Sequence, residues 1–189
     1  MDRTGNLLVA TPLLRDPNFE RAVILVVEED PAGTLGVVLN RPTEVPVSTV
    51  LEPWGALTAG PQVVFQGGPV ALDNALGVAA VGTHGDEEPL GWRAITGDGG
   101  GGPLGLVDLD APPEVLAAEI SGLRIFAGYA GWGAGQLDGE IDEGAWYVLD
   151  ARPDDPFTSD PGRLWQHVLR RQGGELALVS TFPSDPTAN

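Results

Sequence analysis

The chain has 189 residues, a mass of 19.7 kDa, 42% hydrophobic residues and a formal net charge of −17 at pH 7. It has no cysteine, and all ten basic residues are arginine. This composition excludes disulfides, thiol nucleophiles, cysteine-bound metals and lysine Schiff bases. The negative charge opposes binding to DNA or to anionic membranes.

The length and apolar content predict one domain spanning residues 1–189. No apolar run reaches the roughly 18 residues of a membrane-spanning helix. The N-terminal residues lack the basic start and apolar segment of a secretion signal. We therefore expect a protein that is neither secreted nor anchored by a membrane-spanning helix. The sequence leaves open whether it is a monomer or a homodimer.

Apolar runs of strand length dominate the first half of the chain. They predict strands at 6–11, 21–28, 34–40, 62–66 and 76–81. The second and third of these runs flank a turn, Asp30-Pro31-Ala32-Gly33, which predicts a β-hairpin. Residues 47–54, between two prolines, predict a short helix.

Residues 82–103 show little regular pattern, and we expect a mobile loop there. An acidic run follows His84, and four glycines occupy 99–102. Within this loop the sequence favours only a brief strand at 92–95.

The second half alternates predicted helices with predicted strands. Helices are expected at 110–121, 136–143 and 161–172, and strands at 123–127, 145–149 and 175–179. Asp110 and Asp160 are suited to cap the first and last of these helices. The last helix carries one apolar stripe, formed by Leu164, Trp165, Val168 and Leu169. Residues 183–189 are expected to be frayed.

The strongest local motif is GYAGWGAG at 128–135. Glycines between a strand and a helix can bring backbone N–H groups close to an anion, and Asp150 stands where a dinucleotide fold would place its ribose-binding acid. The spacing, however, is G-x-G-x-G rather than G-x-G-x-x-G, and the acidic helix that follows would repel phosphate. A closely packed loop, with Tyr129 and Trp132 in the core, is the favoured interpretation, and no cofactor is expected.

Two further motifs have both a structural and a functional interpretation. Arg41 follows a predicted strand and could hold a carboxylate or phosphate in two hydrogen bonds, or it could pair with one of the 27 acidic residues. Gly67 and Gly68 indicate a turn with positive φ, or a cluster of backbone N–H groups that faces a cleft.

The sequence contains no organised catalytic or metal site. None of the serines lies in a G-x-S-x-G motif, and nothing positions a Ser48–His84–Asp98 triad. His84 lies near three acidic residues, but a solvated loop is the favoured interpretation. We therefore predict no catalytic residues and no bound metal.

Three stretches, taken together, resemble the YqgE/AlgH family of small bacterial proteins. The first is GNLLVATPLLRDPNFERAVILVVEEDPAGTLGVVLNRP at 5–42, the second is GGPV at 67–70, and the third is RIFAGYAGWGAGQLDGEIDEGAW at 124–146. They occur in the family's order and are followed by a tryptophan-bearing helix around Trp165. Residues 71–110 match poorly.

The resemblance implies a single mixed α/β (α+β) domain, with a β-sheet curled towards a pseudo-barrel and helices packed outside. It also implies a cytoplasmic protein. Some family members are labelled transcriptional regulators because of an effect on alginate genes. The family supplies no catalytic residues. Its polar positions nevertheless make a candidate ligand-binding set together with the two glycines: Asn40, Arg41, Gly67, Gly68, Arg124, Trp132, Gln136 and Glu140. The same polar residues could instead be buried groups that specify the fold.

We consider three functional hypotheses. The favoured one is a non-enzymatic binding or regulatory module that acts through a protein partner or a small ligand. The second is a regulator that binds DNA directly, which the net charge and the lack of a helix-turn-helix pattern oppose. The third is a hydrolase that uses a carboxylate such as Glu140 as general base.

Overall fold

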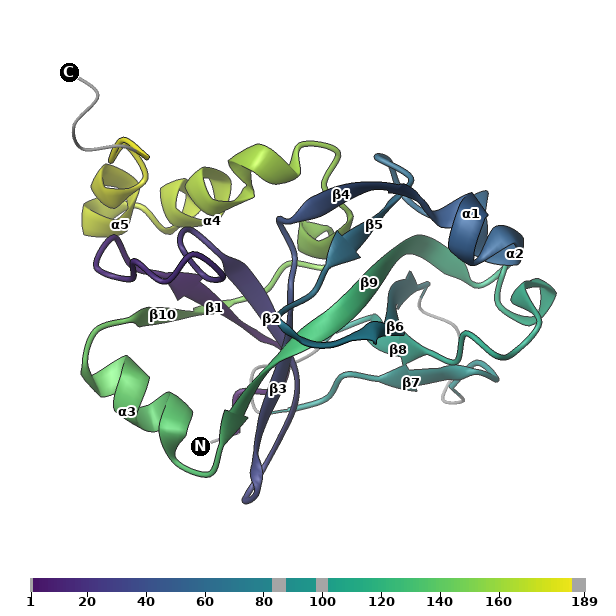
Figure 1. Ribbon diagram of the computed structural model, residues 1–189, viewed down its shortest axis with the longest axis horizontal. Helices are drawn as coiled ribbons and strands as arrows, with labels where there is room; N and C mark the ends of the chain where they lie inside the picture. The colour runs from purple at the N-terminus through teal and green to yellow at the C-terminus, as the bar shows by residue number, and fades with distance from the viewer. Residues whose placement is uncertain (1, 83–87, 98–101, 185–189) are drawn as a thin grey trace.

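The computed structural model describes residues 2–82, 88–97 and 102–184 (Figure 1). Within them, ten strands belong to one sheet. These strands are β1 (Asn6–Ala10), β2 (Val23–Asp30), β3 (Gly33–Val38), β4 (Pro42–Pro46), β5 (Val63–Gln66), β6 (Val70–Val81), β7 (Trp92–Ala94), β8 (Leu104–Val107), β9 (Ile120–Gly133) and β10 (Trp146–Asp150). The helices are α1 (Val47–Val50), α2 (Glu52–Gly55), α3 (Gln136–Asp142), α4 (Leu164–Gln172) and α5 (Gly174–Val179). Short 3-10 turns occupy Pro113–Val115, Asp155–Phe157 and Pro161–Arg163.

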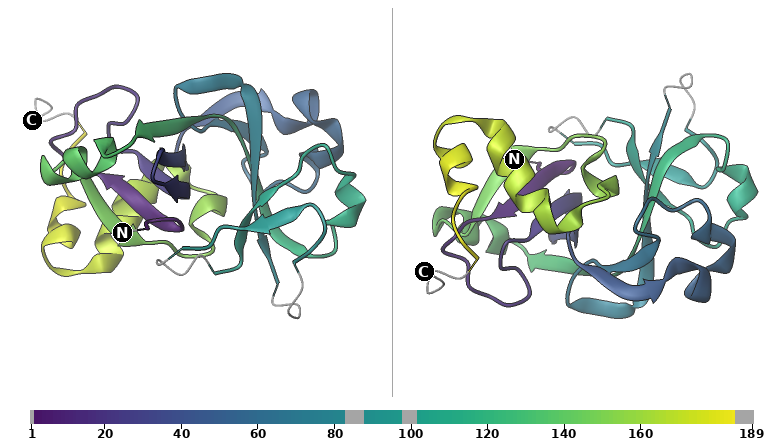
Figure 2. Two further views of the ribbon diagram at one scale, coloured as in Figure 1. Left: turned by 90° about the horizontal axis from the view of Figure 1, so that it is seen from below. Right: turned by 90° about the horizontal axis from the view of Figure 1, so that it is seen from above.

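The long strand β9 organises the sheet. The main path runs β10-β1-β2-β3-β9-β6-β8-β7, and every pairing along it is antiparallel. β5 joins β9 in parallel and carries β4 on its other edge. Because β9 receives β3 and β5 at different points along its length, the sheet branches there and curls into a half-barrel (Figure 2). The predicted single mixed α/β domain with a curled sheet is confirmed.

Alternate residues of β1 and β2 enter two different cores. Leu7, Val9 and Val23 pack with the buried residues of α4, whereas Leu8 and Ile24 pack in a second core with the region of α3. Since neighbouring side chains of a strand point to opposite faces, α3 and α4 cover opposite faces of this part of the sheet (Figure 1). α1 and α2 lie at the other end of the molecule, over a third core.

Several predicted elements are confirmed. β2 and β3 form the expected hairpin, and the Asp30 carboxylate accepts hydrogen bonds from the N–H groups of Ala32 (2.7 Å) and Gly33 (3.0 Å) in its turn. The apolar stripe of α4 is buried, and Trp165 Nε1 donates to the Ala10 carbonyl at 2.8 Å. This helix begins at Leu164 after a 3-10 turn, and Asp160 makes no side-chain capping hydrogen bond.

Three predicted elements are wrong. The helix expected at 110–121 is only a 3-10 turn, because β9 begins at Ile120 and pairs with Val81 of β6. The motif at 128–135 is not a loop, since its residues up to Gly133 continue β9, where they pair with β3. The strand expected at 175–179 is helix α5, because a short apolar run has no period that separates a strand from a buried helix.

Some predictions concern residues outside the described ranges. Of the loop expected at 82–103, residues 83–87 and 98–101 are not described, and the intervening part contains β7, close to the brief strand predicted at 92–95. Of the tail expected to be frayed, 185–189 are likewise outside. In the described ranges, no helix is both long and apolar enough to cross a membrane.

Candidate functional site

Arg124 of β9 is fully buried, and its guanidinium group has no free donor. Its Nε donates to the Pro156 carbonyl at 3.0 Å, and each terminal nitrogen donates twice. The four further acceptors are the carbonyls of Ala59 (3.0 Å), Pro61 (2.9 Å), Gly60 (3.2 Å) and Thr158 (2.9 Å). Since arginine has five N–H donors, this predicted site residue holds two loops onto β9 and cannot also bind a ligand.

Burial lowers the pKa of Arg124 to about 10. The group therefore stays protonated at neutral pH. Its charge is met by carbonyl dipoles and by the face of the Phe65 ring, 4.2 Å from the guanidinium carbon, with no carboxylate in ion-pair contact among the described residues.

Trp132, Gln136 and Glu140, three of the candidate ligand-binding residues, lie together in a closed hydrogen-bond network. Glu140 Oε2 accepts from the indole nitrogens of Trp132 (2.9 Å) and Trp146 (2.8 Å), and Oε1 accepts from Gln136 Nε2 (3.1 Å). Gln136 Oε1 in turn accepts from the Gly133 N–H at 3.0 Å. The Phe19 ring packs on both indoles. These contacts give the three residues an anchoring role between β9, α3 and β10.

Asn40 and the two glycines also make structural contacts. Asn40 accepts from the Val23 N–H at 3.0 Å and donates to the Arg21 carbonyl at 2.9 Å. Gly67 donates to Ala127 and accepts from Val38, so its N–H does not face a cleft. A Cβ on Gly68 would lie 2.1 Å from the Tyr129 carbonyl carbon. The glycines therefore let the chain cross close over β9 between β5 and β6.

Arg41 differs from the other predicted site residues because most of its donors are unused. Within the described residues, the only hydrogen bond of its side chain runs from Nη2 to the Glu20 carbonyl, and it forms no ion pair. Burial lowers its pKa, although the charge of Glu20 acts in the opposite direction. Arg41 lines a small pocket of about 70 Å³ together with Pro17, Asn18, Val38, Gln66, Gly68 and Pro69.

A larger apolar groove of about 420 Å³ lies next to β4, the strand that begins directly after Arg41. Its floor contains Val64 of β5 and Ile125 and Ala127 of β9. β4 and α1 form one wall, and the first half of β6 forms the other. The lining residues are Thr43, Val45, Val50, Leu51, Val64, Leu72, Asp73, Asn74, Ala75, Ile125 and Ala127.

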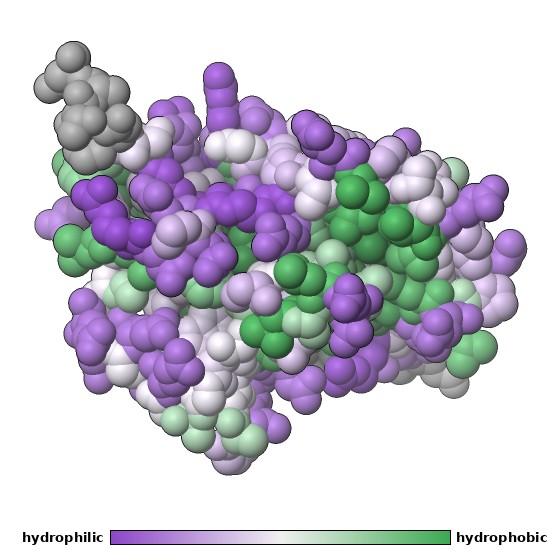
Figure 3. All heavy atoms as spheres, in the orientation of Figure 1, coloured by the Kyte–Doolittle hydropathy of each residue, from purple (hydrophilic) through white to green (hydrophobic). Residues whose placement is uncertain are grey.

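Large apolar side chains on this groove are open to solvent. Val45 is 43% exposed, Val50 57% and Leu72 53%. The space-filling view shows apolar surface gathered over β4, α1 and the start of β6 (Figure 3). Sequence reasoning missed this site, because it predicted no strand at 42–46 and predicted the strand that corresponds to β6 only from residue 76 instead of Val70. The signal that could have identified the groove was the presence of apolar residues in segments for which no other element was predicted to cover them.

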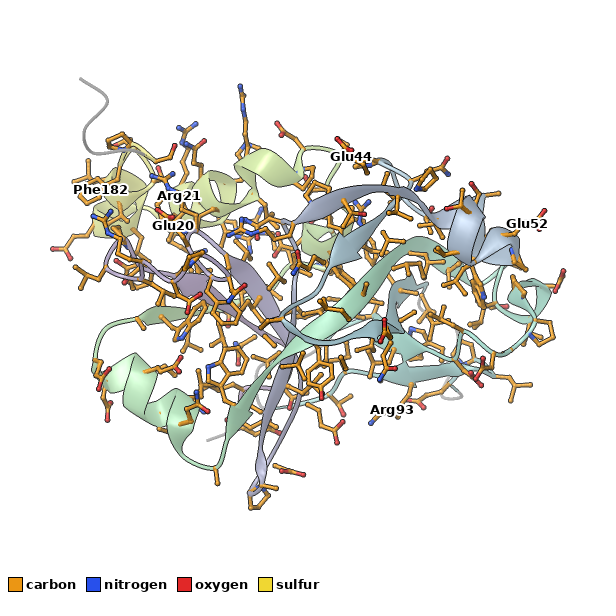
Figure 4. The ribbon with its side chains drawn as sticks, in the orientation of Figure 1. Glu20, Arg21, Glu44, Glu52, Arg93 and Phe182 are labelled. Atoms are coloured by element: carbon orange, nitrogen blue, oxygen red, sulfur yellow. The ribbon has the colours of Figure 1, made fainter. Side chains whose placement is uncertain are left out.

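The charges around the groove are acidic. Asp73 lines it, and no arginine is among its lining residues. Glu44 of β4 and Glu52 at the start of α2 are exposed beside it (Figure 4). The groove therefore combines an apolar floor with an acidic rim, which we define as Asp73 in its lining and the exposed Glu44 and Glu52 on the elements that border it.

The remaining sequence motifs add no second site. His84 and Asp98 lie outside the described residues, so the distances within the Ser48–His84–Asp98 arrangement are not defined. In the described part of the chain, no three acidic or histidine side chains are placed to hold a metal ion. The eight predicted residues thus divide among Arg124, the Glu140 network and the surroundings of Arg41, and they do not share one cleft.

Comparisons with known proteins give consistent matches over almost the whole chain. A family model described as AlgH-like matches residues 7–177. A UPF0301 protein of Streptomyces coelicolor is 60% identical, covering 98% of this chain and 95% of its own. A UPF0301 protein of Mycobacterium tuberculosis is 48% identical, with 99% and 91% covered.

Two solved structures have the same fold. The crystal structure of a Corynebacterium diphtheriae protein superposes with a TM-score of 0.85 at 35% identity, covering 94% of this chain and 91% of that one. The solution structure of the AlgH protein of Pseudomonas aeruginosa gives a TM-score of 0.67 at 25% identity, with 97% and 95% covered.

Proposed function

This chain belongs to the AlgH-like family, and from that premise we propose that it is a non-enzymatic cytoplasmic binding module. Its ligand is an apolar polypeptide segment flanked by basic residues, which binds in the groove between β4, α1 and β6. The observation that carries the proposal is the exposed apolar lining of this groove beneath an acidic rim.

The apolar lining supports a protein partner rather than a polar metabolite. Val45, Val50 and Leu72 keep a large share of their surface in water, and covering such surface is favourable in proportion to the apolar area removed from water. Clustered apolar residues with a polar border are typical of protein interaction sites.

Charge distinguishes between the possible occupants. A second copy of this chain would bring another net charge of −17 to an already acidic rim, which opposes self-association. A nucleic acid would meet the same repulsion. A segment with arginine or lysine beside its apolar residues would be attracted, so any effect on transcription would be indirect and pass through a protein partner.

The two polar clusters support a role without catalysis. Arg124 has no donor left for a substrate, and the oxygens of Glu140 already accept three hydrogen bonds. These hydrogen bonds engage three of the about four lone-pair positions of a carboxylate, and a general base needs a free lone pair within reach of the proton it removes. The hydrolase hypothesis therefore finds no support in the contacts of Glu140.

A peptide-display selection tests the proposal and needs no identified partner. Random nonapeptides would be selected against the wild-type protein, once in a library with free C-termini and once in a library with the same segment placed internally. We expect enrichment of aliphatic residues next to arginine or lysine. Binding of the enriched peptides should fall at least tenfold for Leu72→Glu, because a carboxylate then enters the apolar wall.

Leu178→Glu is the matched control, because Leu178 is an exposed leucine, 68% accessible, on α5 at the other end of the molecule. Peptides that bind Leu72→Glu and wild type equally would contradict the proposal, as would the absence of enrichment. Sedimentation equilibrium tests the alternative that a second copy of this chain occupies the groove. A wild-type dimer that Leu72→Glu dissociates would assign the groove to a second copy.

A further inference from the structure

The pocket at Arg41 and the apolar groove lie along the same pair of strands, because Arg41 directly precedes β4 and Gln66 ends β5. The Thr43 hydroxyl donates to the Val64 carbonyl at 2.6 Å, and both residues line the groove. The Gln66 N–H donates to the Arg41 carbonyl at 2.8 Å, and both residues line the small pocket. These are successive contacts of the β4–β5 pair. Two residues along a strand span about 7 Å, so the pocket lies beside the end of the groove.

The polar side chains in this pocket can all donate hydrogen bonds. Arg41 brings free N–H groups, and the side-chain amides of Asn18 and Gln66 make no hydrogen bond to the described residues. No carboxylate of the described residues lines the pocket, although 27 residues of the chain are acidic. The two acids nearby are Glu20, whose charge acts on Arg41, and Asp16, whose carboxylate accepts from the Asn18 N–H.

The size of the pocket limits its ligand. At about 70 Å³ it is well below the roughly 300 Å³ at which pockets for whole small molecules begin. It can take a single anionic group whose remainder lies elsewhere. A planar guanidinium with free donors matches the two oxygens of a carboxylate. A polypeptide has one such group that does not depend on sequence, its C-terminus.

We propose that Arg41 and Gln66 bind the C-terminal carboxylate of the partner polypeptide, whose preceding apolar residues lie in the groove between β4, α1 and β6. This inference rests on the proposed function. It adds that the bound segment is the C-terminus of the partner and specifies in which direction that segment runs along the groove. The basic residues of the partner then lie upstream of its apolar C-terminal residues, close to the acidic rim.

The test compares one peptide in two chemical forms. The nonapeptide most enriched from the free-end library would be synthesised as the C-terminal acid and as the C-terminal amide, and titrated by calorimetry. We expect the acid to bind wild type at least tenfold more tightly than the amide. Equal affinities would overturn the inference and leave the proposed function intact, whereas no binding by either form would overturn both.

Variants assign the effect to the pocket. In Arg41→Gln the acid should lose its advantage over the amide. Gln66→Glu gives an independent check, because Gln66 is exposed and a carboxylate there should reverse the preference without disturbing the fold. Arg93→Gln is the control, since Arg93 is 65% exposed on β7 and its replacement removes the same charge. A preference for the acid that survives in both pocket variants would contradict the role of Arg41 and Gln66.

Discussion

Arg124 and Arg41 occupy two regions that differ in how fully their polar groups are satisfied. Arg124 lies within the sheet and donates five hydrogen bonds to five backbone carbonyls. Arg41 precedes an edge strand, donates one, and lines a pocket. Both are arginines whose pKa is lowered by burial. The comparison teaches that the number of free donors, rather than burial or charge, separates an arginine that builds the fold from one that can bind a ligand.

Replacing Arg124 should have the largest effect on stability. Arg124→Gln leaves several buried carbonyls without a donor, so we expect a loss of about 4 kcal/mol or more in the free energy of unfolding. Because domains of this kind have a total stability of only about 5–15 kcal/mol, the variant should be close to unfolding. Urea denaturation followed by tryptophan fluorescence measures the loss. A change below about 1 kcal/mol would contradict the structural role.

The Glu140 network should come second. Glu140→Ala leaves two indole N–H groups unpaired in a region where Trp132 and Trp146 are 5% and 3% exposed. We expect a loss of about 3 kcal/mol. Glu140→Gln is the matched control and should cost about 1 kcal/mol, because its oxygen can still accept from both indoles. Equal losses for the two variants would show that the hydrogen bonds are not the cause.

Arg41→Gln should affect stability much less than the same change at Arg124. It removes one hydrogen bond, to the Glu20 carbonyl, so we expect a loss of about 1 kcal/mol in thermal or urea unfolding. If Arg41→Gln lost as much unfolding free energy as Arg124→Gln, the two arginines would not differ, and Arg41 would have a structural role like that of Arg124.

The groove should tolerate change best. Val50→Glu places a charge on a side chain that is already 57% exposed, so the free energy of unfolding should change by no more than about 0.5 kcal/mol. Peptide binding should nevertheless be lost. A large loss of stability would mean that Val50 supports the core, and unchanged binding would mean that the groove is not the site.

The sequence predicted most elements whose residues carry a clear local pattern. The hairpin of β2 and β3 has two β-branched runs around a turn, and α4 has an apolar stripe at helical spacing. The errors occurred where the local pattern was ambiguous. Asp110 and two prolines suggested a helix start, but pairing with β6 extends β9 back to Ile120. The glycines at 128–133 suggested a loop, but strands can include glycine where neighbouring backbones approach closely.

The candidate site could be predicted only in part. Chemistry and family resemblance selected Arg41, Arg124, Gln136 and Glu140 as candidate ligand-binding residues. They could not show which of them have free hydrogen-bonding groups, because the partners of Arg124 come from residues up to 65 positions away in the chain. Val45, Val50 and Leu72 attracted no attention, since isolated apolar residues in a sequence do not reveal that nothing covers them.

The sequence by itself determined the excluded chemistries, the family and the elements with a clear local pattern, such as the β2–β3 hairpin and α4, because composition, motifs and short-range periodicity are properties of neighbouring residues. Only the tertiary structure decided which polar side chains are satisfied and where apolar surface remains open. Both depend on how β9 brings together β3, β5 and β6 from distant parts of the chain. Hydrogen-bond saturation and solvent exposure arise from contacts between distant segments, and local sequence does not encode them.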